Sequence, residues 1–189
     1  MLSSYKISNL LPANDLLLKN DIYLVLLYAA RIPPHLLISV HGKIFTLNVT
    51  GASVDGELDA LLKLIRKKRI ETIFIRLTLP ALFTVDNLKK EIRSCTLAYP
   101  RVDIGIATCL TPINDFCHTI YNTDKNNVNL IFDLLPRLKL VNAMRDCYQM
   151  NLDHRTSAER EVNSNFFELK LYQVNDVHEA IRAKSLAMS

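Results

Sequence analysis

Cys109 is the residue of this chain best placed for covalent chemistry, because a strand is expected to end just before it and a helix to begin just after it. The partial positive charge at a helix N-terminus lowers the pKa of a nearby thiol and favours the nucleophilic thiolate. A nucleophilic cysteine also needs a base, usually histidine, and a polar group that orients that histidine. The sequence offers His35 as the base and Asn48 or Thr46 as the orienting group.

Each of these residues also has an ordinary structural explanation. Free cysteine is among the most buried residue types, so Cys109 is equally well explained as a small core residue. His35 would then be a turn residue and Asn48 a solvent-facing one. The residues by themselves leave the catalytic and the structural interpretation open.

A β-hairpin is the element expected to bring His35 close to its orienting group. Pro33-Pro34 disfavours a helix before it, since the residue preceding a proline is pushed to extended geometry. Residues 36–40 and 43–50 are rich in β-formers, and His41-Gly42 between them suits a two-residue turn. That loop length predicts the pairs Val40–Lys43, Ile38–Phe45 and His35–Asn48, with Leu36, Ile38, Val40, Phe45 and Leu47 on one apolar face.

Hydrophobic spacing and turn residues predict the other elements. We expect strands over 22–28, 72–77, 102–107 and 166–174, a turn over 51–56, and helices from Asp55 to Arg69, from Thr84 or Asp86 to Tyr99, and from Pro112 to Tyr121 with Thr111 as cap. In the C-terminal third, Met144, Cys147 and Tyr148 suggest an apolar helix face, and Asn175 is expected to cap a final helix.

These elements predict an α+β protein with a small antiparallel sheet and a cysteine carried by a helix. The chain has 189 residues, of which 49% are hydrophobic, so it is long enough to bury a core of its own. The polar, Asn-rich stretch 123–129 suggests a boundary. We therefore expect an α+β domain over 1–125 and a mainly helical C-terminal extension over 126–189 packed on it.

Composition limits the classes of partner and compartment. The formal net charge of +4 is too small to indicate nucleic acid, which we regard as an improbable partner. The first eleven residues do not resemble a signal peptide, and no apolar run approaches the roughly 20 residues that span a bilayer. The four cysteines form no Cys-x-x-Cys pair, which is typical of reduced thiols. These features predict a cytoplasmic protein without a transmembrane segment.

No cofactor or metal ion is expected. Cys117-His118 is the closest pairing of metal-ligating residues, and it lacks the further ligands of a zinc site. The densest basic cluster is Arg66-Lys67-Lys68-Arg69, at the C-terminal end of a predicted helix. Cations at that end complement the helix dipole and stay hydrated, so we expect this cluster to have a structural role. Binding of an anionic partner by the cluster is the alternative hypothesis.

Two segments resemble a known family. Asn20-Asp21-Ile22-Tyr23 followed by the run from Pro34 to Lys43 resembles the circularly permuted papain-like hydrolases and acyltransferases of the lecithin:retinol acyltransferase type. In that family a Gly-Asp-Ile strand leads to a His-x-Gly-Ile strand, and a cysteine follows later at the start of a helix. The segment Thr108 to Ile113 takes that later place. The resemblance covers about residues 20–121, and Asn20 and Leu37 depart from the pattern.

The resemblance implies a permuted papain-like fold with Cys109 as nucleophile and His35 as base. Such an enzyme would be a cysteine hydrolase or acyltransferase, similar to thiol proteases, that acts on an amide or ester bond of a peptide, lipid or other small acyl substrate. The alternative is a catalytically inactive domain of the same fold that binds a protein or a ligand. We carry both hypotheses forward.

Overall fold

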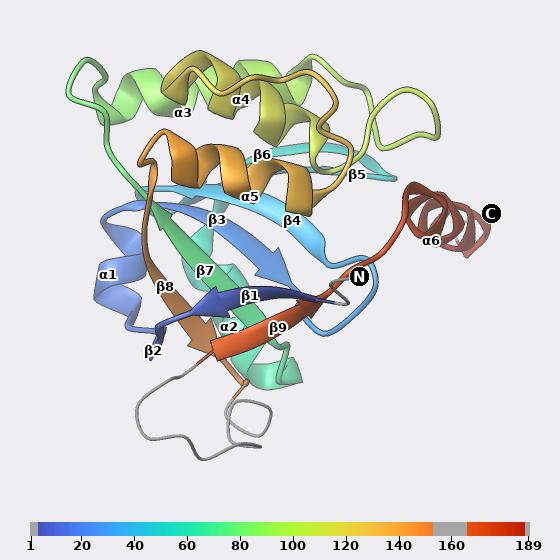
Figure 1. Cartoon of the computed structure of the whole chain (residues 1–189), viewed down its shortest axis with the longest axis horizontal. Helices are drawn as coiled ribbons and strands as arrows, with labels where there is room; N and C mark the ends of the chain where they lie inside the picture. The colour runs from blue at the N-terminus through green and yellow to red at the C-terminus, as the bar shows by residue number, and fades with distance from the viewer. Residues whose placement is uncertain (1–3, 153–165, 188–189) are drawn as a thin grey trace.

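The computed structural model describes residues 4–152 and 166–187, which form a mixed α+β fold around a large sheet (Figure 1). Seven strands lie side by side in the order β2-β8-β7-β3-β4-β5-β6. Every neighbouring pair is antiparallel except β2 and β8, which run parallel. The sheet is therefore larger than the small antiparallel sheet that the sequence predicted.

The strands of this sheet differ in how far they are buried. All six residues of β3 are buried, which explains their continuous apolar run: a strand covered on both faces has no polar side. The strands are β2 (Leu10–Pro12), β3 (Ile22–Leu27), β4 (His35–Val40), β5 (Lys43–Asn48), β6 (Gly51–Glu57), β7 (Thr72–Leu77) and β8 (Met144–Met150).

Helices cover both faces of the sheet. The face beneath α3 (Val85–Leu97), α4 (Thr111–Tyr121) and α5 (Ile131–Leu140) holds the largest apolar cluster, which includes Ile38 and Phe116. The opposite face packs against α2 (Leu58–Lys68), with Leu18 of the short helix α1 (Asp15–Lys19) in the same cluster. The upper layer of helices and the sheet below it are visible in Figure 1.

Two C-terminal elements lie outside the large sheet. Strand β9 (Phe166–Lys170) pairs antiparallel with β1 (Ser4–Ser8) to form a separate two-stranded ribbon. Helix α6 (Val174–Leu186) follows and stands apart from the other helices (Figure 1). Only Ile181 of α6 is fully buried, in a third apolar cluster that also contains Leu47.

The β4–β5 hairpin confirms the predicted register at its turn. Val40 pairs with Lys43 and Ile38 with Phe45, which leaves His41-Gly42 as a two-residue loop. Both loop residues have positive φ, as a type I′ turn requires. The predicted pair His35–Asn48 does not form, because regular pairing ends at Ile38 and Phe45.

Most helices that were expected from apolar spacing are present. They are α2, α3 and α4, and Thr84 caps α3 with its side chain as a capping box with Asn87. The first residue of α4 was misjudged: Thr111 lies inside the helix, where its hydroxyl accepts from the Thr108 N–H, and Leu110 takes the cap position.

Two segments between elements were predicted wrongly. The segment Gly51–Glu57, expected to be a turn, is strand β6, and it pairs with β5 beside a register shift. Residues 102–107, expected to be a strand, form only the isolated bridge Asp103–Ala107. A bulge accommodates glycine and positive φ within a strand, which is how Asp55 fits in β6.

Within the described part of residues 126–189, two strands, β8 and β9, accompany the helices α5 and α6, and the helix face expected around Met144, Cys147 and Tyr148 is wrong. Met144–Met150 is strand β8, which lies between β2 and β7 inside the large sheet. Residues 126–189 therefore help to complete the same sheet as residues 1–125. The last helix is capped at Gln173 and not at Asn175.

Candidate functional site

The β4–β5 hairpin opens at the end opposite its turn. If the register of the closed end continued, the backbone of Leu36 would pair with Leu47, but no such pair forms. Instead, the Thr46 hydroxyl donates to the Leu36 carbonyl over 3.2 Å. The Leu36 N–H lies near the Cys109 sulfur and favours its charged form, which lowers the thiol pKa. We call this open end, formed by residues 35–36 and 46–48, the fork.

A cavity of about 540 Å³ lies at the fork, within the size range of small-molecule sites. Helix α6 covers one side of it, and the loop that carries Pro33 and Pro34 borders another. The lining is mainly apolar and includes Ile32, Pro33, Pro34, Leu47, Val49, Val102, Val177, Ala180, Ile181 and Ala183. Its polar side chains include His35, Asn48, Thr108, Cys109 and Lys184.

His35 is held at the cavity by Thr46. The Thr46 oxygen lies 3.0 Å from Nε2 of His35, and the one hydroxyl proton of Thr46 is donated to Leu36. Nε2–H of His35 must therefore donate to Thr46, which leaves Nδ1 as the unprotonated nitrogen. Burial, with a smaller effect from the Lys184 ammonium, lowers the pKa of His35 to about 4.

Cys109 lies two residues before the first residue of α4, and not on the helix itself. The backbone N–H of Leu36, the Lys184 ammonium and the backbone N–H groups of Cys109 and Leu110 all favour the thiolate and lower the thiol pKa. Burial opposes them and has the larger effect, so the pKa of Cys109 is raised above its ordinary value. This corrects the expectation that the start of a helix would make Cys109 a thiolate.

The surroundings of Cys109 include two residues that the sequence did not single out. The Lys184 ammonium is close enough to act on both Cys109 and His35. Tyr172 also lies near the thiol, and burial and Cys109 raise the pKa of its phenol. Both come from the segment around α6, whose position over the fork depends on the tertiary fold and has no local sequence signal.

The chemical state of the cavity follows from these pKa values. At neutral pH the Cys109 thiol and the His35 imidazole are both uncharged. A thiolate–imidazolium pair would need the opposite order, with a low thiol pKa and a high histidine pKa. Among the described residues no hydrogen bond joins Cys109 to His35. The cavity therefore holds two uncharged polar side chains, Cys109 and His35, and its lining also includes the cationic side chains of Arg31 and Lys184.

The structure brings together all four predicted site residues. Cys109, His35 and Asn48 line the fork cavity. Thr46 does not line it but forms a hydrogen bond with His35. Of the two candidate orienting groups, Thr46 makes the contact. Asn48 faces the cavity, and its backbone carbonyl accepts a hydrogen bond from Val102 over 2.8 Å.

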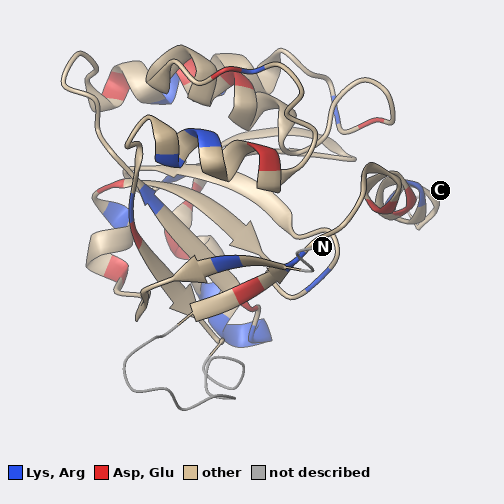
Figure 2. Ribbon diagram, viewed as in Figure 1, with Lys and Arg blue, Asp and Glu red and all other residues tan. Residues whose placement is uncertain are grey.

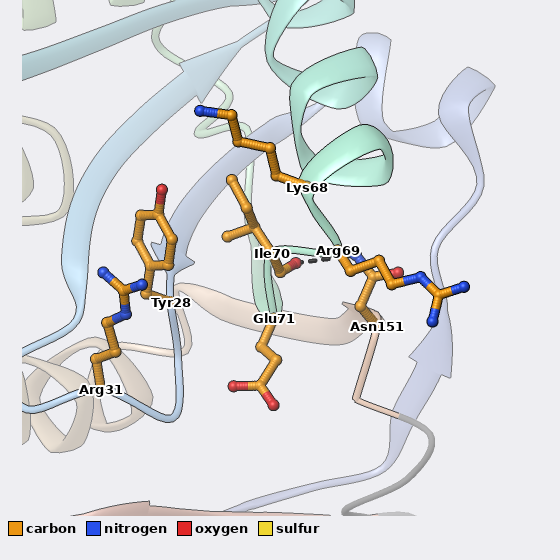
Figure 3. A pocket seen from close by; sticks show the side chains of 7 residues that line it. All are labelled: Tyr28, Arg31, Lys68, Arg69, Ile70, Glu71 and Asn151. Atoms are coloured by element: carbon orange, nitrogen blue, oxygen red, sulfur yellow. Dashed lines mark hydrogen bonds between the residues drawn. The ribbon is translucent and has the colours of Figure 1, made fainter.

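A second hollow of about 670 Å³ adjoins the fork cavity at two shared residues, Tyr28 and Arg31. Its other lining residues are Lys68, Arg69, Ile70, Glu71 and Asn151 (Figure 3). Lys and Arg residues are concentrated in the last turn of α2, where the ribbon is blue in Figure 2. We call it the cationic hollow. It contains half of the basic cluster that the sequence singled out.

Neither a metal site nor a membrane helix was found in the described part of the chain. Residues 4–152 and 166–187 contain no group of three or more His, Cys, Asp or Glu side chains that could hold a metal ion. No helix within these ranges is both long and apolar enough to cross a bilayer. All four cysteines are free.

Comparisons with family models, with curated proteins and with solved structures found no match to this chain. The permuted papain-like fold and the activity that the resemblance implied therefore remain hypotheses. The arrangement of the fork cavity is the basis on which a function can be proposed.

Proposed function

We propose that this protein is a binding module for a small, mainly apolar ligand that occupies the fork cavity. The observation that carries the proposal is a cavity of about 540 Å³ whose lining is mainly apolar and in which the side chains of Cys109 and His35 are uncharged at neutral pH. Sites of this kind combine apolar walls with a few fixed polar groups that orient the ligand.

The break in the β4–β5 ladder supports the proposal. Opening a hairpin removes backbone hydrogen bonds. The Leu36 carbonyl accepts from the Thr46 hydroxyl instead, and the Leu36 N–H lies near the Cys109 sulfur. The fork is thus held open by specific contacts. A cavity that exists before the ligand arrives binds without the cost of reorganising the strands.

Filling the cavity tests the proposal. Ala180 of α6 is half-buried and lines the cavity, whereas Ala60 of α2 is exposed on another helix. Isothermal titration with decanol should show binding to the wild type and to Ala60→Phe, and loss of binding to Ala180→Phe. The melting temperature without ligand shows whether each variant is folded. Equal binding to folded Ala180→Phe and Ala60→Phe would overturn the proposal.

Thiol hydrolysis or acyl transfer is a second candidate function, favoured by one specific observation. The three N–H groups around the Cys109 sulfur would also stabilise an oxyanion formed by attack on an ester or amide carbonyl. In that mechanism the Cys109 sulfur forms a bond to the acyl carbon, and His35 accepts the thiol proton and returns it to the leaving group. Water or another acceptor then releases the acyl group.

Alkylation of Cys109 against pH separates the two candidates. Binding without catalysis predicts a thiol that reacts only at high pH, with the same profile in His35→Ala. A reactive thiol at neutral pH that loses its reactivity in His35→Ala would favour catalysis instead. Cys95, Cys117 and Cys147 are buried, and Cys109→Ser gives the background of the assay.

A further inference from the structure

The place where the fork cavity meets the cationic hollow carries a further inference, which rests on the proposed function. Tyr28 and Arg31 line both spaces. One side of this junction is apolar, and the other has Arg31, Lys68 and Arg69 in its wall. A ligand that extended across the junction would need an apolar body and an anionic group.

Arg31 is held in place at the junction by Tyr28. The carbon of its guanidinium group lies 4.1 Å from the centre of the Tyr28 ring, which is a cation–π contact. Tyr28 itself has a φ of 55°, in the left-handed region that a bulky residue rarely adopts. Backbone strain of this kind persists only where the surrounding structure fixes it.

The cations of the hollow are not used by ion pairs within the described part of the protein. The ion pairs among residues 4–152 and 166–187 include neither Arg31 nor Lys68 nor Arg69. By contrast, the neighbouring Arg66 pairs with Asp15. Figure 3 shows Lys68 and Arg31 directed to the side of the hollow where Tyr28 lies, whereas Arg69 extends away from it.

Two groups in the hollow could oppose an anion. The carbonyl groups at the end of α2 carry partial negative charge, but Asn151 donates to those of Ile65 and Ile70 over 3.3 Å and 3.0 Å. The Glu71 carboxylate lies at the opposite end of the hollow from the Lys68 amine (Figure 3). The part of the hollow beside Tyr28, with Lys68 and Arg31 on either side of the ring in the view of Figure 3, is therefore the part suited to an anion.

We propose that the protein binds an amphipathic anion, with its apolar body in the fork cavity and its carboxylate or phosphate group in the cationic hollow beside Tyr28, where Arg31 and Lys68 supply positive charge. Arg31 offers a planar set of donors that matches either oxyanion, and Lys68 adds a second positive charge. Lys184 lines the fork cavity near His35 and Cys109 and does not line the cationic hollow, so the proposal assigns the anion to Arg31 and Lys68.

Three probes with one chain length test this inference by isothermal titration: decanol, decanoate and decyl phosphate, each below its aggregation concentration. The wild type should bind the two anions at least about ten-fold more tightly than decanol, because hydrogen bonds to charged groups are the stronger ones. The better of the two anions identifies the headgroup. Added salt should weaken the binding of the anions and leave decanol unchanged.

The double variant Arg31→Gln/Lys68→Gln should lose the preference for anions and bind decanol as the wild type does. The matched control is Lys67→Gln, an exposed cation of α2 that does not line the hollow. Anions that bind no better than decanol would overturn the inference and leave the proposed function standing. The inference would also be overturned if Lys184→Gln lost the preference for anions and the double variant kept it. If none of the three probes binds, the proposed function fails as well.

Discussion

The two ends of the β4–β5 hairpin are built from the same strands but are closed in different ways. At the turn, the backbone ladder is regular, and two neighbouring segments bond to the loop residues. The His41 N–H donates to the Asp21 carbonyl over 2.9 Å, and the Leu58 N–H donates to the Gly42 carbonyl over 2.9 Å. At the fork, the ladder stops, the Thr46 hydroxyl donates to the Leu36 carbonyl instead, and the Cys109 sulfur lies near the Leu36 N–H.

This difference shows how one hairpin can serve both stability and binding. The turn end fixes the register and joins the sheet to the start of α2, so it determines where the fork lies. At the fork the two strands are not paired through their backbones, and a cavity lined by residues of β4, β5 and α6 lies there. Removing a group at the turn end should change stability, whereas removing a group at the fork should change binding or pH dependence as well.

The largest expected effect is on packing. Phe45 is 1% exposed beside the closed end of the hairpin, and Phe45→Ala should lower the free energy of unfolding by about 4 kcal/mol. Leu47 is fully buried but borders the cavity, so Leu47→Ala should cost only about 2 kcal/mol. Urea unfolding measures both. A cost at Leu47 equal to that at Phe45 would contradict a preformed cavity.

The next effect is a pH dependence caused by His35. Its folded-state pKa of about 4 lies below the ordinary value of 6.5, so the unfolded chain binds a proton that the folded protein does not. Stability present above pH 6.5 should fall by about 3 kcal/mol as the pH drops to 4. His35→Gln, which keeps a donor for Thr46 but cannot titrate, should lose that part of the acid sensitivity.

Urea unfolding at several pH values checks this expectation, with His178→Gln as the control. His178 lies on α6 but does not line the cavity. An unchanged acid sensitivity in His35→Gln would mean that His35 is not buried in its neutral form, and the account of the fork would lose one of its two uncharged groups.

A smaller effect is expected at Thr46, which links His35 to the backbone of Leu36. Thr46→Val keeps the shape of the side chain and leaves both partners without their hydrogen bond, at a cost of about 2 kcal/mol. The exposed Thr50 gives the control variant Thr50→Val. Decanol binding should also weaken in Thr46→Val, since His35 is no longer oriented. A loss of stability with no change in binding would separate Thr46 from the site.

The smallest effect is expected at the turn itself. Gly42 has a φ of 77°, and its Cβ would meet nothing closer than the Lys19 carbonyl oxygen at 3.8 Å, so only backbone strain opposes a side chain there. Gly42→Ala should cost about 1 kcal/mol and leave decanol binding unchanged. Weaker binding would show that the two ends of the hairpin are coupled more strongly than their separate contacts suggest.

The sequence predicted the closed end of the hairpin because its signals are local. His41-Gly42 requires a tight turn, and alternating apolar residues give the register of Ile38 and Val40. The fork was not predicted, because the same alternation continues to Leu36 and Leu47. Only the tertiary structure, with α6 and Cys109 packed at this place, explains why the strands separate.

The pKa of Cys109 shows a similar limit. Its position near a helix N-terminus was correctly predicted, and the expected effect of nearby N–H groups is present. Burial has the opposite and larger effect, and burial depends on residues far away in the chain. Strand β8 was misjudged for a related reason: the apolar residues of Met144–Met150 fit a helix face as well as a strand, and the sheet position decided between them.

Protection of Cys109 from alkylation is the most direct test of a ligand in the fork cavity. The rate of modification by iodoacetamide would be measured at high pH, with and without decanol at a concentration that saturates binding in calorimetry. Because Cys109 lines the cavity, the bound ligand should slow the reaction. An unchanged rate in the presence of bound decanol would place the ligand elsewhere and contradict the proposed function.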